Sequence, residues 1–540
     1  MMQTMTVAQL LVHKLALAGV KKIFGLPGGG SSLDIIAAAA SENIQFVLTK
    51  TENAAVMMAG ALAESTGVPG VALMTKGPGL TNAANGVAYA SLDRAPVIVL
   101  TDGFTPKQLT YITHQVFDQQ AVLRPLVKAV SRLESSDPES EIDALLVAAT
   151  THPFGPVHIE LTSETARRNV DFVGNHDKVS LPSDVDLKQF EVLRASLQSA
   201  RKPIVVLGLE ARAHSEAVRV FVQSLGCAVL ATYKAKGVVP DKSPQVLGIF
   251  TGGSLEQEAI AAADLMVLVG MDPVELILQP WRYTTPVVDI TSFKHPVHYI
   301  EPSAQVVGCI TEVLTRLTGT GACGKKEWEP AELECLRANA RAQLAYAPVK
   351  NSVAPDRVVQ LTAASCEKAG ITPFFSIDAG AHMFSVAAFF PAQRAGDVLI
   401  SNGLATMAFA LPAAISAAVQ DPRAPVLCFT GDGGLMMCLG ELCTAVEQRA
   451  QIIVIVFNDS ALSLIDIKQQ SRSLTPNGVR WQYHNFAATM SALGGFGVSV
   501  STEQEFVAAM EQALATKRPS LIDVSIDPTG YPEQLKAMRG

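Results

Sequence analysis

Short apolar segments alternate with helical stretches from one end of the chain to the other, and this alternation restricts the fold more than any other feature. The apolar segments have the length and composition of buried parallel strands, and they are residues 44–48, 70–74, 97–100, 157–159, 204–207, 265–269, 426–429 and 452–457. Helical stretches such as 7–18 and 53–65 lie between them. The pattern predicts an α/β protein whose sheets are mostly parallel.

Two polar connections, at about 167–187 and 318–355, divide the 540 residues. At roughly 150 residues per domain, this length predicts three or four domains. We therefore expect three doubly wound α/β domains, which span residues 1–170, 188–320 and 355–530. Ligands of such domains bind at the carboxyl ends of the strands.

The composition excludes several classes of protein. Charged residues make up 17% and the apolar set 49%, which is typical of a globular chain and not of a disordered one. The net charge of −8 is spread without basic blocks, so we expect no nucleic-acid partner. No run of 18 apolar residues predicts a membrane span, and the first residues do not resemble a secretion signal. We expect a cytoplasmic protein whose 8 cysteines are reduced.

One predicted strand runs directly into the sequence Gly431-Asp432-Gly433-Gly434. The glycines let the backbone approach a ligand closely. The residues that follow, 435–448, predict a helix whose N-terminus would favour phosphate oxygens. The segment thus indicates a phosphate site at the end of the strand.

A second predicted strand, 452–457, ends at Asn458 and Asp459. Asp459 follows Asp432 by 27 residues, which is enough for one helix and one strand. If the two strands are adjacent and parallel, both carboxylates lie at the same edge of the sheet. Oxygen ligands of this kind, together with phosphate oxygens, suit Mg²⁺.

Read together, these segments resemble the thiamine-diphosphate signature of the superfamily of acetolactate synthase, pyruvate decarboxylase and benzaldehyde lyase. The resemblance implies that Asp432 and Asp459 bind the metal through their side chains and Ala461 through its carbonyl. Gly431, Gly433 and Gly434 would contact the cofactor. It also implies that the chain is an enzyme that makes or breaks carbon–carbon bonds next to a carbonyl.

Two upstream segments extend the resemblance. Residues 401–415 resemble the family's glycine-rich entry to this domain, so the Ala405 carbonyl and the Met407 amide would hold the aminopyrimidine, and the Met407 side chain would bend the cofactor. Residues 376–383 resemble the family's first diphosphate loop, so Ala381 and His382 would contact the phosphates. Taken alone, Met407 also suits a core position.

The N-terminal segment contains Glu52 at the start of an apolar helix, and Gly77-Pro78-Gly79 follows one helix and one strand later. A glutamate in the first turn of a helix also complements the helix dipole, which is the purely structural alternative. These segments resemble the family's pattern, in which a glutamate at this position hydrogen-bonds N1′ of the pyrimidine and promotes loss of the thiazolium C2 proton. The resemblance implies this role for Glu52. Gly29, in the glycine-rich segment before it, would lie at the cofactor.

Glu52 belongs to the first domain and Asp432 to the third. In the family the cofactor lies between these domains of two subunits, so the resemblance implies a homodimer or homotetramer with active sites at the subunit interface. The domains would be the pyrimidine-binding, central and diphosphate-binding domains. The acidic–basic segment that binds FAD in acetolactate synthases has no match near 269–280, so we expect no FAD.

The substrate is a 2-oxo acid or an acyloin by the same resemblance. Gln115 matches an active-site glutamine, His114 stands where acetolactate synthases usually have Phe, and Leu464 would face the cofactor and the substrate. Lys76 and Lys468 are candidates for attracting an anionic substrate. We expect a 2-oxo-acid decarboxylase or carboligase. The alternatives are a 2-hydroxy-ketone or 2-hydroxyacyl-CoA lyase and a cofactor-binding paralogue without catalysis.

Overall fold

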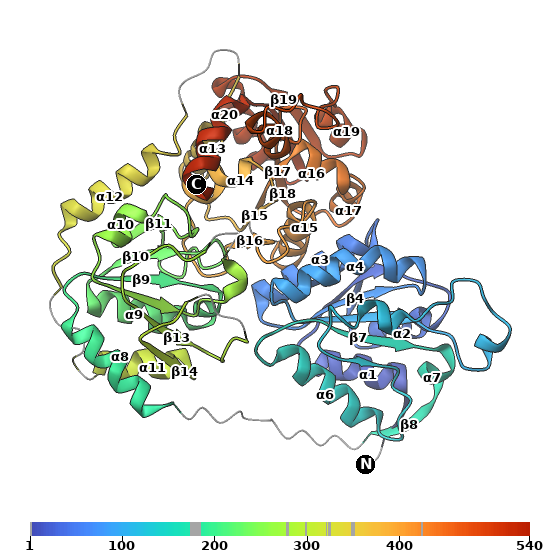
Figure 1. Ribbon diagram of the computed structural model, residues 1–540. Coiled ribbons are helices and arrows are strands. Elements are labelled where there is room, and N and C mark those ends of the chain that lie inside the picture. Colours follow the sequence, from blue (N-terminus) through green and yellow to red (C-terminus); the bar gives the residue numbers. More distant parts are fainter. Residues whose placement is uncertain are drawn as a thin grey trace.

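The computed structural model describes residues 3–172, 185–276, 280–296, 300–319, 321, 326–346, 352–422 and 425–540. It confirms three α/β domains, each built on a six-stranded parallel sheet with helices on its faces (Figure 1). The chain visits the three sheets in order, so each domain is continuous in sequence. The limits proposed from the sequence for each domain stay predictions.

The N-terminal sheet has the strand order β3-β2-β4-β5-β7-β6. These strands are Gln45–Leu48, Lys22–Leu26, Gly70–Met74, Val97–Asp102, Val157–Leu161 and Val130–Ser131. The helices are α1 Val7–Leu17, α2 Ser31–Ser41, α3 Glu52–Thr66, α4 Pro78–Leu92, α5 Gln119–Leu123, α6 Pro138–Thr150 and α7 Ser163–Arg167, with a 3₁₀ turn at Gln108–Thr110. An antiparallel pair, β1 (Gln3–Thr6) and β8 (Asn169–Phe172), closes the domain.

The central sheet has the strand order β11-β10-β9-β12-β13-β14. These strands are Val246–Ile249, Ala228–Ala231, Pro203–Leu207, Leu265–Val269, Val287–Thr291 and Ala304–Val307. The helices are α8 Leu187–Ser199, α9 Ser215–Leu225, α10 Gln257–Ala261, α11 Ile310–Gly319 and α12 Pro330–Ala342, with 3₁₀ turns at Leu209–His214 and Pro273–Glu275.

The C-terminal sheet has the strand order β16-β15-β17-β18-β20-β19. These strands are Val398–Ile400, Phe375–Ile377, Val426–Gly431, Ile452–Asn458, Ser520–Ser525 and Phe496–Val500. The helices are α13 Pro355–Lys368, α14 His382–Phe389, α15 Ala410–Gln420, α16 Asp432–Met437, α17 Glu441–Glu447, α18 Ser463–Ser471, α19 Phe486–Ala492, α20 Glu503–Ala515 and α21 Tyr531–Arg539, with a 3₁₀ turn at Pro528–Gly530.

The eight strands proposed from the sequence are present, and their ends differ by at most two residues. The single helix proposed for 435–448 is wrong, because the chain forms α16 and then, after a break, α17. The carboxylate of Glu441, the first residue of α17, accepts the backbone N–H groups of Lys50 and Thr51 in the N-terminal domain at 3.0 and 2.9 Å. This tertiary contact, invisible in local periodicity, fixes where α17 begins.

The first proposed connection is also partly structured, because β8 lies within it. Its residues 173–184 lie outside the described part of the chain. The second connection contains the helix α12.

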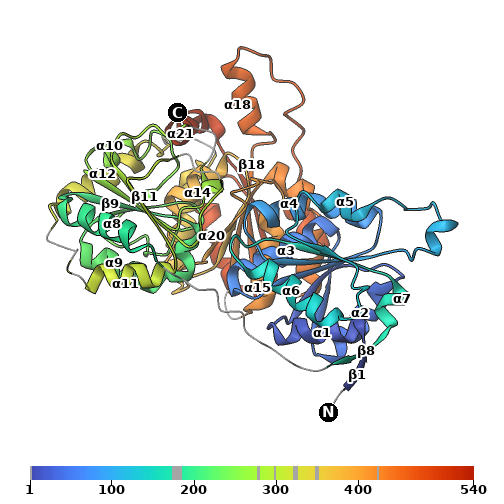
Figure 2. The same cartoon turned by 60° about the horizontal axis from the view of Figure 1, so that its bottom comes forward.

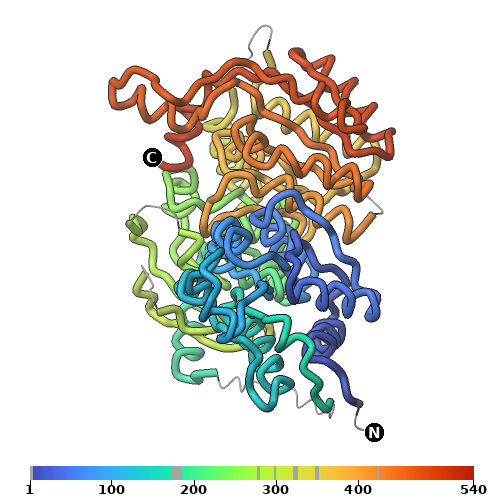
Figure 3. The backbone as a smooth tube through the Cα atoms, turned by 90° about the vertical axis from the view of Figure 1, so that its right-hand side faces the viewer, coloured from blue at the N-terminus to red at the C-terminus, as the bar shows by residue number. Residues whose placement is uncertain are grey.

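Helices α3 and α15 join the N-terminal and C-terminal domains, which lie side by side in Figures 1 and 3. Both helices are apolar on every side, and such helices are buried on every side. Their many Ala and Gly residues let the backbones approach closely, and the Ser416 hydroxyl donates to the Met58 carbonyl at 2.7 Å. One continuous apolar core therefore spans both domains, whereas two further core clusters lie within the central domain.

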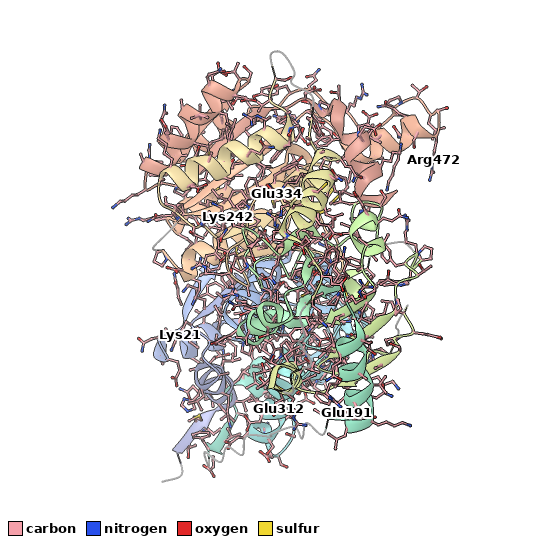
Figure 4. All side chains as sticks on the ribbon, turned by 90° about the vertical axis from the view of Figure 1, so that its left-hand side faces the viewer. Lys21, Glu191, Lys242, Glu312, Glu334 and Arg472 are labelled. Atoms are coloured by element: carbon pink, nitrogen blue, oxygen red, sulfur yellow. The ribbon has the colours of Figure 1, made fainter. Side chains whose placement is uncertain are left out.

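Lys21, Glu312 and Arg472 are among the charged side chains that lie on the outside of the molecule (Figure 4). Within the described residues, no helix has both the length and the apolar character that a membrane span requires.

We predict that Phe409→Ala destabilises both domains of the shared core together. The Phe409 ring is 0% exposed and lies 4.7 Å from the Tyr89 ring of the N-terminal domain, measured between centroids. Truncating a buried phenylalanine typically costs about 3–5 kcal/mol. In hydrogen exchange near the unfolding temperature, the amides of the N-terminal and C-terminal sheets should both exchange faster than in the wild-type protein.

The matched control is Phe221→Ala, which removes an equally buried ring from a core cluster within the central domain. It should accelerate exchange in the central sheet. A loss of protection confined to the C-terminal domain in Phe409→Ala would contradict a shared core.

Candidate functional site

The site is built on two adjacent strands of the C-terminal sheet. β17 pairs in parallel with β18, with Gly431 opposite Phe457, so Asp432 and Asp459 follow at the same edge. A cavity of about 230 Å³ opens there. Its lining includes eleven of the residues that the sequence singled out, namely Ala381, His382, Ala405, Met407, Gly431, Asp432, Gly433, Gly434, Asp459, Ala461 and Leu464.

Both aspartates line the cavity, and the Ser463 hydroxyl donates a hydrogen bond to Asp459. Asp432 Oδ1 accepts the Gly433 N–H at 2.8 Å, whereas the buried Asp432 Oδ2 has no hydrogen-bond partner. Burial, together with the charge of Asp459, raises the pKa of Asp432 to about 7, and burial also raises the pKa of Asp459. A cation bound by the two carboxylates would stabilise their charged forms. No third His, Cys, Asp or Glu completes a metal site within the described residues, so further ligands must include backbone or ligand oxygens.

His382 also lines the cavity, at the start of α14. Its ring stacks on Phe457 with the centroids 5.3 Å apart, and Nε2 is buried without a partner. Burial lowers the pKa of His382 to about 3, so the ring is neutral at physiological pH. A neutral imidazole with an unpartnered nitrogen suits a hydrogen bond to a ligand oxygen.

The glycines leave room that side chains would fill. A Cβ on Gly434 would lie 2.2 Å from Asp378 Oδ2, and a Cβ on Gly433 would lie 3.0 Å from the Leu462 side chain and 3.2 Å from Trp481. Glycine suits these two positions, because a side chain there would crowd neighbouring residues of the protein itself. The unpartnered Asp432 oxygen, the neutral His382 and this glycine cradle fit a diphosphate with a divalent cation.

The loop of Ala405 and Met407 forms the other end of the cavity. Ala405 and Ala408 have φ values of 53° and 67°, which are strained for residues with a side chain. Asp378, at the end of β15, accepts the backbone N–H groups of Ala408 and Phe409 at 3.1 Å each. Met407 reaches across toward Gly433, whose Cβ position is 3.5 Å from the Met407 methyl group. The loop is therefore held in a bent form over the cradle.

Glu52 is the first residue of α3 and is half-buried, and Thr51 caps that helix by accepting the Ala54 N–H at 3.1 Å. One Glu52 oxygen accepts a hydrogen bond from the Asn82 amide group. Glu52 does not line the cavity, and neither does any other described residue of the N-terminal domain.

The remaining N-terminal candidates also lie away from the cavity. Gly29 is exposed before α2. His114 is exposed and Gln115 half-buried with φ 59°, on the segment between β5 and α5 that extends from the body of the domain in Figure 2. The Gln115 Cβ lies 2.9 Å from the Cβ position of Gly77. The structure thus gathers the C-terminal candidates in one place and leaves the N-terminal ones on a separate surface.

Some residues of the site were not assigned a role from the sequence. Phe457 and Tyr531 line the cavity, and Asp378 holds its loop. Asp378 could have been found, because it follows a buried strand as Asp432 does. Tyr531 lies on the last helix, and no local pattern connects that helix to the sheet edge.

Three family models match consecutive parts of the chain. They are described as the N-terminal TPP binding domain, the central domain and the C-terminal TPP binding domain of thiamine pyrophosphate enzymes, and they match residues 5–122, 191–317 and 378–524. The chain belongs to the thiamine pyrophosphate enzymes. The family resemblance drawn from Asp432, Asp459 and Glu52 is thereby confirmed, and so is the expectation of an enzyme that depends on this cofactor.

Relatives of this thiamine pyrophosphate enzyme align along nearly its whole length. It is 28% identical to the acetolactate synthase isozyme 3 large subunit of Escherichia coli K12, with 99% of this chain and 97% of that protein covered. It is 26% identical to a probable acetolactate synthase large subunit of Methanocaldococcus jannaschii (96% and 92% covered) and 25% identical to an acetolactate synthase of Bacillus subtilis 168 (96% and 93% covered).

We predict that this thiamine pyrophosphate enzyme binds its cofactor only with a divalent cation, because Asp432 and Asp459 would repel an unscreened diphosphate. Calorimetry should show tight binding with Mg²⁺ and little binding with EDTA. Asp432→Ala should weaken cofactor binding about tenfold or more, since a metal ligand is lost.

Asp397→Asn is the matched control, because Asp397 is an equally buried aspartate of the same domain that does not line the cavity. It should leave the cofactor affinity nearly unchanged. Equal affinities with Mg²⁺ and with EDTA would refute the metal assignment.

Proposed function

We propose that the enzyme uses thiamine diphosphate and Mg²⁺ to decarboxylate a 2-oxo acid and to join the resulting acyl unit to an acceptor. The observation that carries the cofactor assignment is the pair of cavity-lining carboxylates, one with an unpartnered oxygen, at the same sheet edge as the glycines. The names of the full-length relatives support the reaction class.

Each group of the cavity has a proposed task. Asp432, Asp459 and the Ala461 carbonyl hold Mg²⁺, which screens the diphosphate from the carboxylates. His382, Ala381 and the three glycines bind the phosphate oxygens. Ala405 and Met407 hold the pyrimidine end, and Leu464 faces the substrate. When bound, the cofactor supplies a carbon nucleophile and an electron sink next to the substrate carbonyl.

Glu52 is proposed to complete this site from a second copy of the chain. Its carboxylate would hydrogen-bond the pyrimidine ring and share a proton with it, which promotes loss of the C2 proton. No described N-terminal residue lines the cavity of its own chain, and this supports a contribution from a second copy. The proposed assembly is a homodimer or homotetramer with active sites at the interface.

The proposed substrate is an anionic 2-oxo acid. Lys76 lies directly before Gly77, and its ammonium is 4.7 Å from the centre of the Phe104 ring, at the base of the segment that carries His114 and Gln115. Lys468 is exposed on α18, beside the cavity residues Leu464 and Ile465. Both cations would face an acid that approaches the open side.

A screen of 2-oxo acids and acyloins with the full-length protein, thiamine diphosphate and Mg²⁺ tests this function by measuring CO₂ and acyloin products. CO₂ release from a 2-oxo acid supports the proposal. Cleavage of a 2-hydroxy ketone or a 2-hydroxyacyl-CoA without CO₂ release would favour the lyase alternative. Cofactor binding without turnover of any of these would favour the non-catalytic alternative.

We also propose that the central domain holds no tightly bound flavin. The strand order of its sheet reverses between β9 and β12, which is where a dinucleotide would bind. The Glu275 carboxylate occupies that point, accepting the Leu209 N–H at 2.7 Å and the Thr232 hydroxyl at 2.6 Å. Burial raises the pKa of Glu275 to about 8. An acid therefore uses the donors that a diphosphate would need.

Absorbance of the purified protein tests this point. We expect no flavin bands above the protein absorbance, before or after denaturation. A stoichiometric yellow cofactor released on denaturation would contradict the assignment of Glu275.

We predict that Glu52→Gln keeps the fold and the bound cofactor but loses most C2 proton exchange. Gln has the same size and still makes hydrogen bonds, but it cannot share an acidic proton. Loss of a positioned acid–base group typically lowers a rate ~10²–10⁴-fold. Deuterium exchange at C2 of the bound cofactor, quenched and read by NMR, measures this directly.

The control is Glu503→Gln, because Glu503 is likewise the first residue of a helix capped by a threonine, Thr502. If Glu52 acts only on the helix dipole, both variants should lose roughly 0.3–1 kcal/mol of stability and exchange C2–H normally. That outcome would overturn the activation role.

We predict that His114→Ala and Lys468→Ala change the choice of substrate and leave C2 exchange intact. Both side chains are exposed and neither lines the cavity, so we expect neither to hold the cofactor. The ratio of kcat/KM for acidic and neutral substrates should fall in each variant. A uniform loss across substrates with weaker cofactor binding would show that these residues act on the cofactor instead.

A further inference from the structure

A buried carboxylate of the N-terminal domain holds the loop that leads into Ala405 and Met407. Asp93 caps the end of α4 and is 1% exposed. It accepts the Asn402 N–H at 2.7 Å, the Gly403 N–H at 3.1 Å and the Leu404 N–H at 3.3 Å. Three successive amides of the C-terminal domain thus converge on one carboxylate of another domain.

The Ser401 hydroxyl extends this contact to the cavity wall. It donates to Asp93 Oδ2 at 3.0 Å and accepts the Thr406 N–H at 3.3 Å. Thr406 stands between Ala405 and Met407, and its hydroxyl also accepts a hydrogen bond from Asn85 of the N-terminal domain at 3.1 Å. Two hydrogen bonds therefore connect Asp93 to the residue between the two cavity positions.

Gly403 makes this approach sterically possible. A Cβ on Gly403 would lie 2.3 Å from the backbone oxygen of Leu92, so only glycine lets the loop reach the end of α4. On the other side of Met407, Asp378 holds the amides of Ala408 and Phe409. The strained loop is thus held at both ends by carboxylates, one from each domain.

The central domain supplies the positive charge that pairs with Asp93. Lys234, in the central domain, is 2% exposed, and its Nζ lies 3.0 Å from Asp93 Oδ1 and 2.8 Å from Glu64 Oε2. Burial lowers the pKa of Lys234, but the Asp93 and Glu64 carboxylates outweigh it and the net shift is upward. The Lys234 ammonium thus pairs with the same carboxylate that accepts the loop amides.

We propose that Asp93, paired with Lys234, is a positioning residue that holds the Ala405–Met407 loop in its cofactor-binding form. The inference rests on the proposed cofactor site, and it adds that all three domains of a single chain shape its pyrimidine end. Asp93 touches neither cofactor nor substrate, because it does not line the cavity.

Two probes of the full-length protein test this proposal. With Mg²⁺ present, inorganic pyrophosphate should engage only the end of the cavity formed by Asp432 and His382, whereas thiamine diphosphate also needs the loop. Asp93→Asn should weaken thiamine diphosphate binding about tenfold or more, the scale of a lost hydrogen bond to a charged group, and change pyrophosphate binding less than about twofold. Hydrogen exchange of residues 401–409 should accelerate without any ligand.

Glu64→Gln is the matched control, because it breaks the other ion pair of Lys234 and makes no contact with the loop. It should lower thermal stability and leave both affinities within about twofold. If Asp93→Asn does not fold, Ser401→Ala replaces it, since it removes only the hydroxyl between Asp93 and Thr406. That variant should show the same selective loss, about threefold.

Unchanged thiamine diphosphate affinity in Asp93→Asn, or in Ser401→Ala when it stands in, would overturn the positioning role while the proposed function stands. An equal loss of both affinities would reduce Asp93 to a general stabiliser and overturn it too. Wild-type protein that binds pyrophosphate but not thiamine diphosphate would instead overturn the proposed function, and the positioning role with it.

Discussion

The parallel pairing of β17 with β18 is the constraint on which the site depends. Because the strands run in the same direction in direct register, the residues that follow them must share one edge of the sheet. Both strands are buried throughout their apolar parts, so this register is fixed by the core and not by the polar residues at its end. The free energy gained by packing the core thus offsets the unfavourable placement of Asp432 and Asp459 close together.

The unfavourable burial of charged groups at this edge appears as shifted pKa values. Burial raises the pKa of Asp378 to about 6 and that of Asp432 to about 7, and it lowers the pKa of His382 to about 3. Such groups oppose folding unless something compensates them. For Asp378 the compensation is internal, because two backbone amides and the Thr430 hydroxyl bond to it. Asp432 Oδ2 and His382 Nε2 have no such partner. A bound cation and ligand oxygens would therefore also stabilise the fold.

Much of the fold could be predicted from local sequence. The buried strands are runs of Val, Ile and Leu, and the glycine string after β17 identified the strand end that carries Asp432. The break between α16 and α17 could not be predicted, since it depends on Glu441 meeting amides almost 400 residues away in sequence. For the same reason Asp93 drew no attention. In the sequence it is an aspartate at the end of a helix, and only the folded chain brings the loop amides to it.

The site was predicted unevenly for a related reason. Residues on the C-terminal sheet edge gather within one chain, because a single register places them. Glu52, Gln115 and His114 lie on another domain, and their relation to the cavity depends on an assembly that one chain does not contain. The N-terminal domain would then act twice in that assembly. Through Asp93 it holds the loop of its own chain, and through Glu52 it would reach the cofactor of its partner.

This double use has a physical consequence for the order of assembly. The loop of Ala405 and Met407 is held by contacts within one chain, so a monomer already has the bent pyrimidine end and the diphosphate cradle. The acid that completes the site would arrive only with the partner. In the proposed mechanism, binding of the diphosphate end and activation of the cofactor would therefore be separable steps. The first would depend on Asp432, His382 and the metal, and the second on Glu52 and the interface.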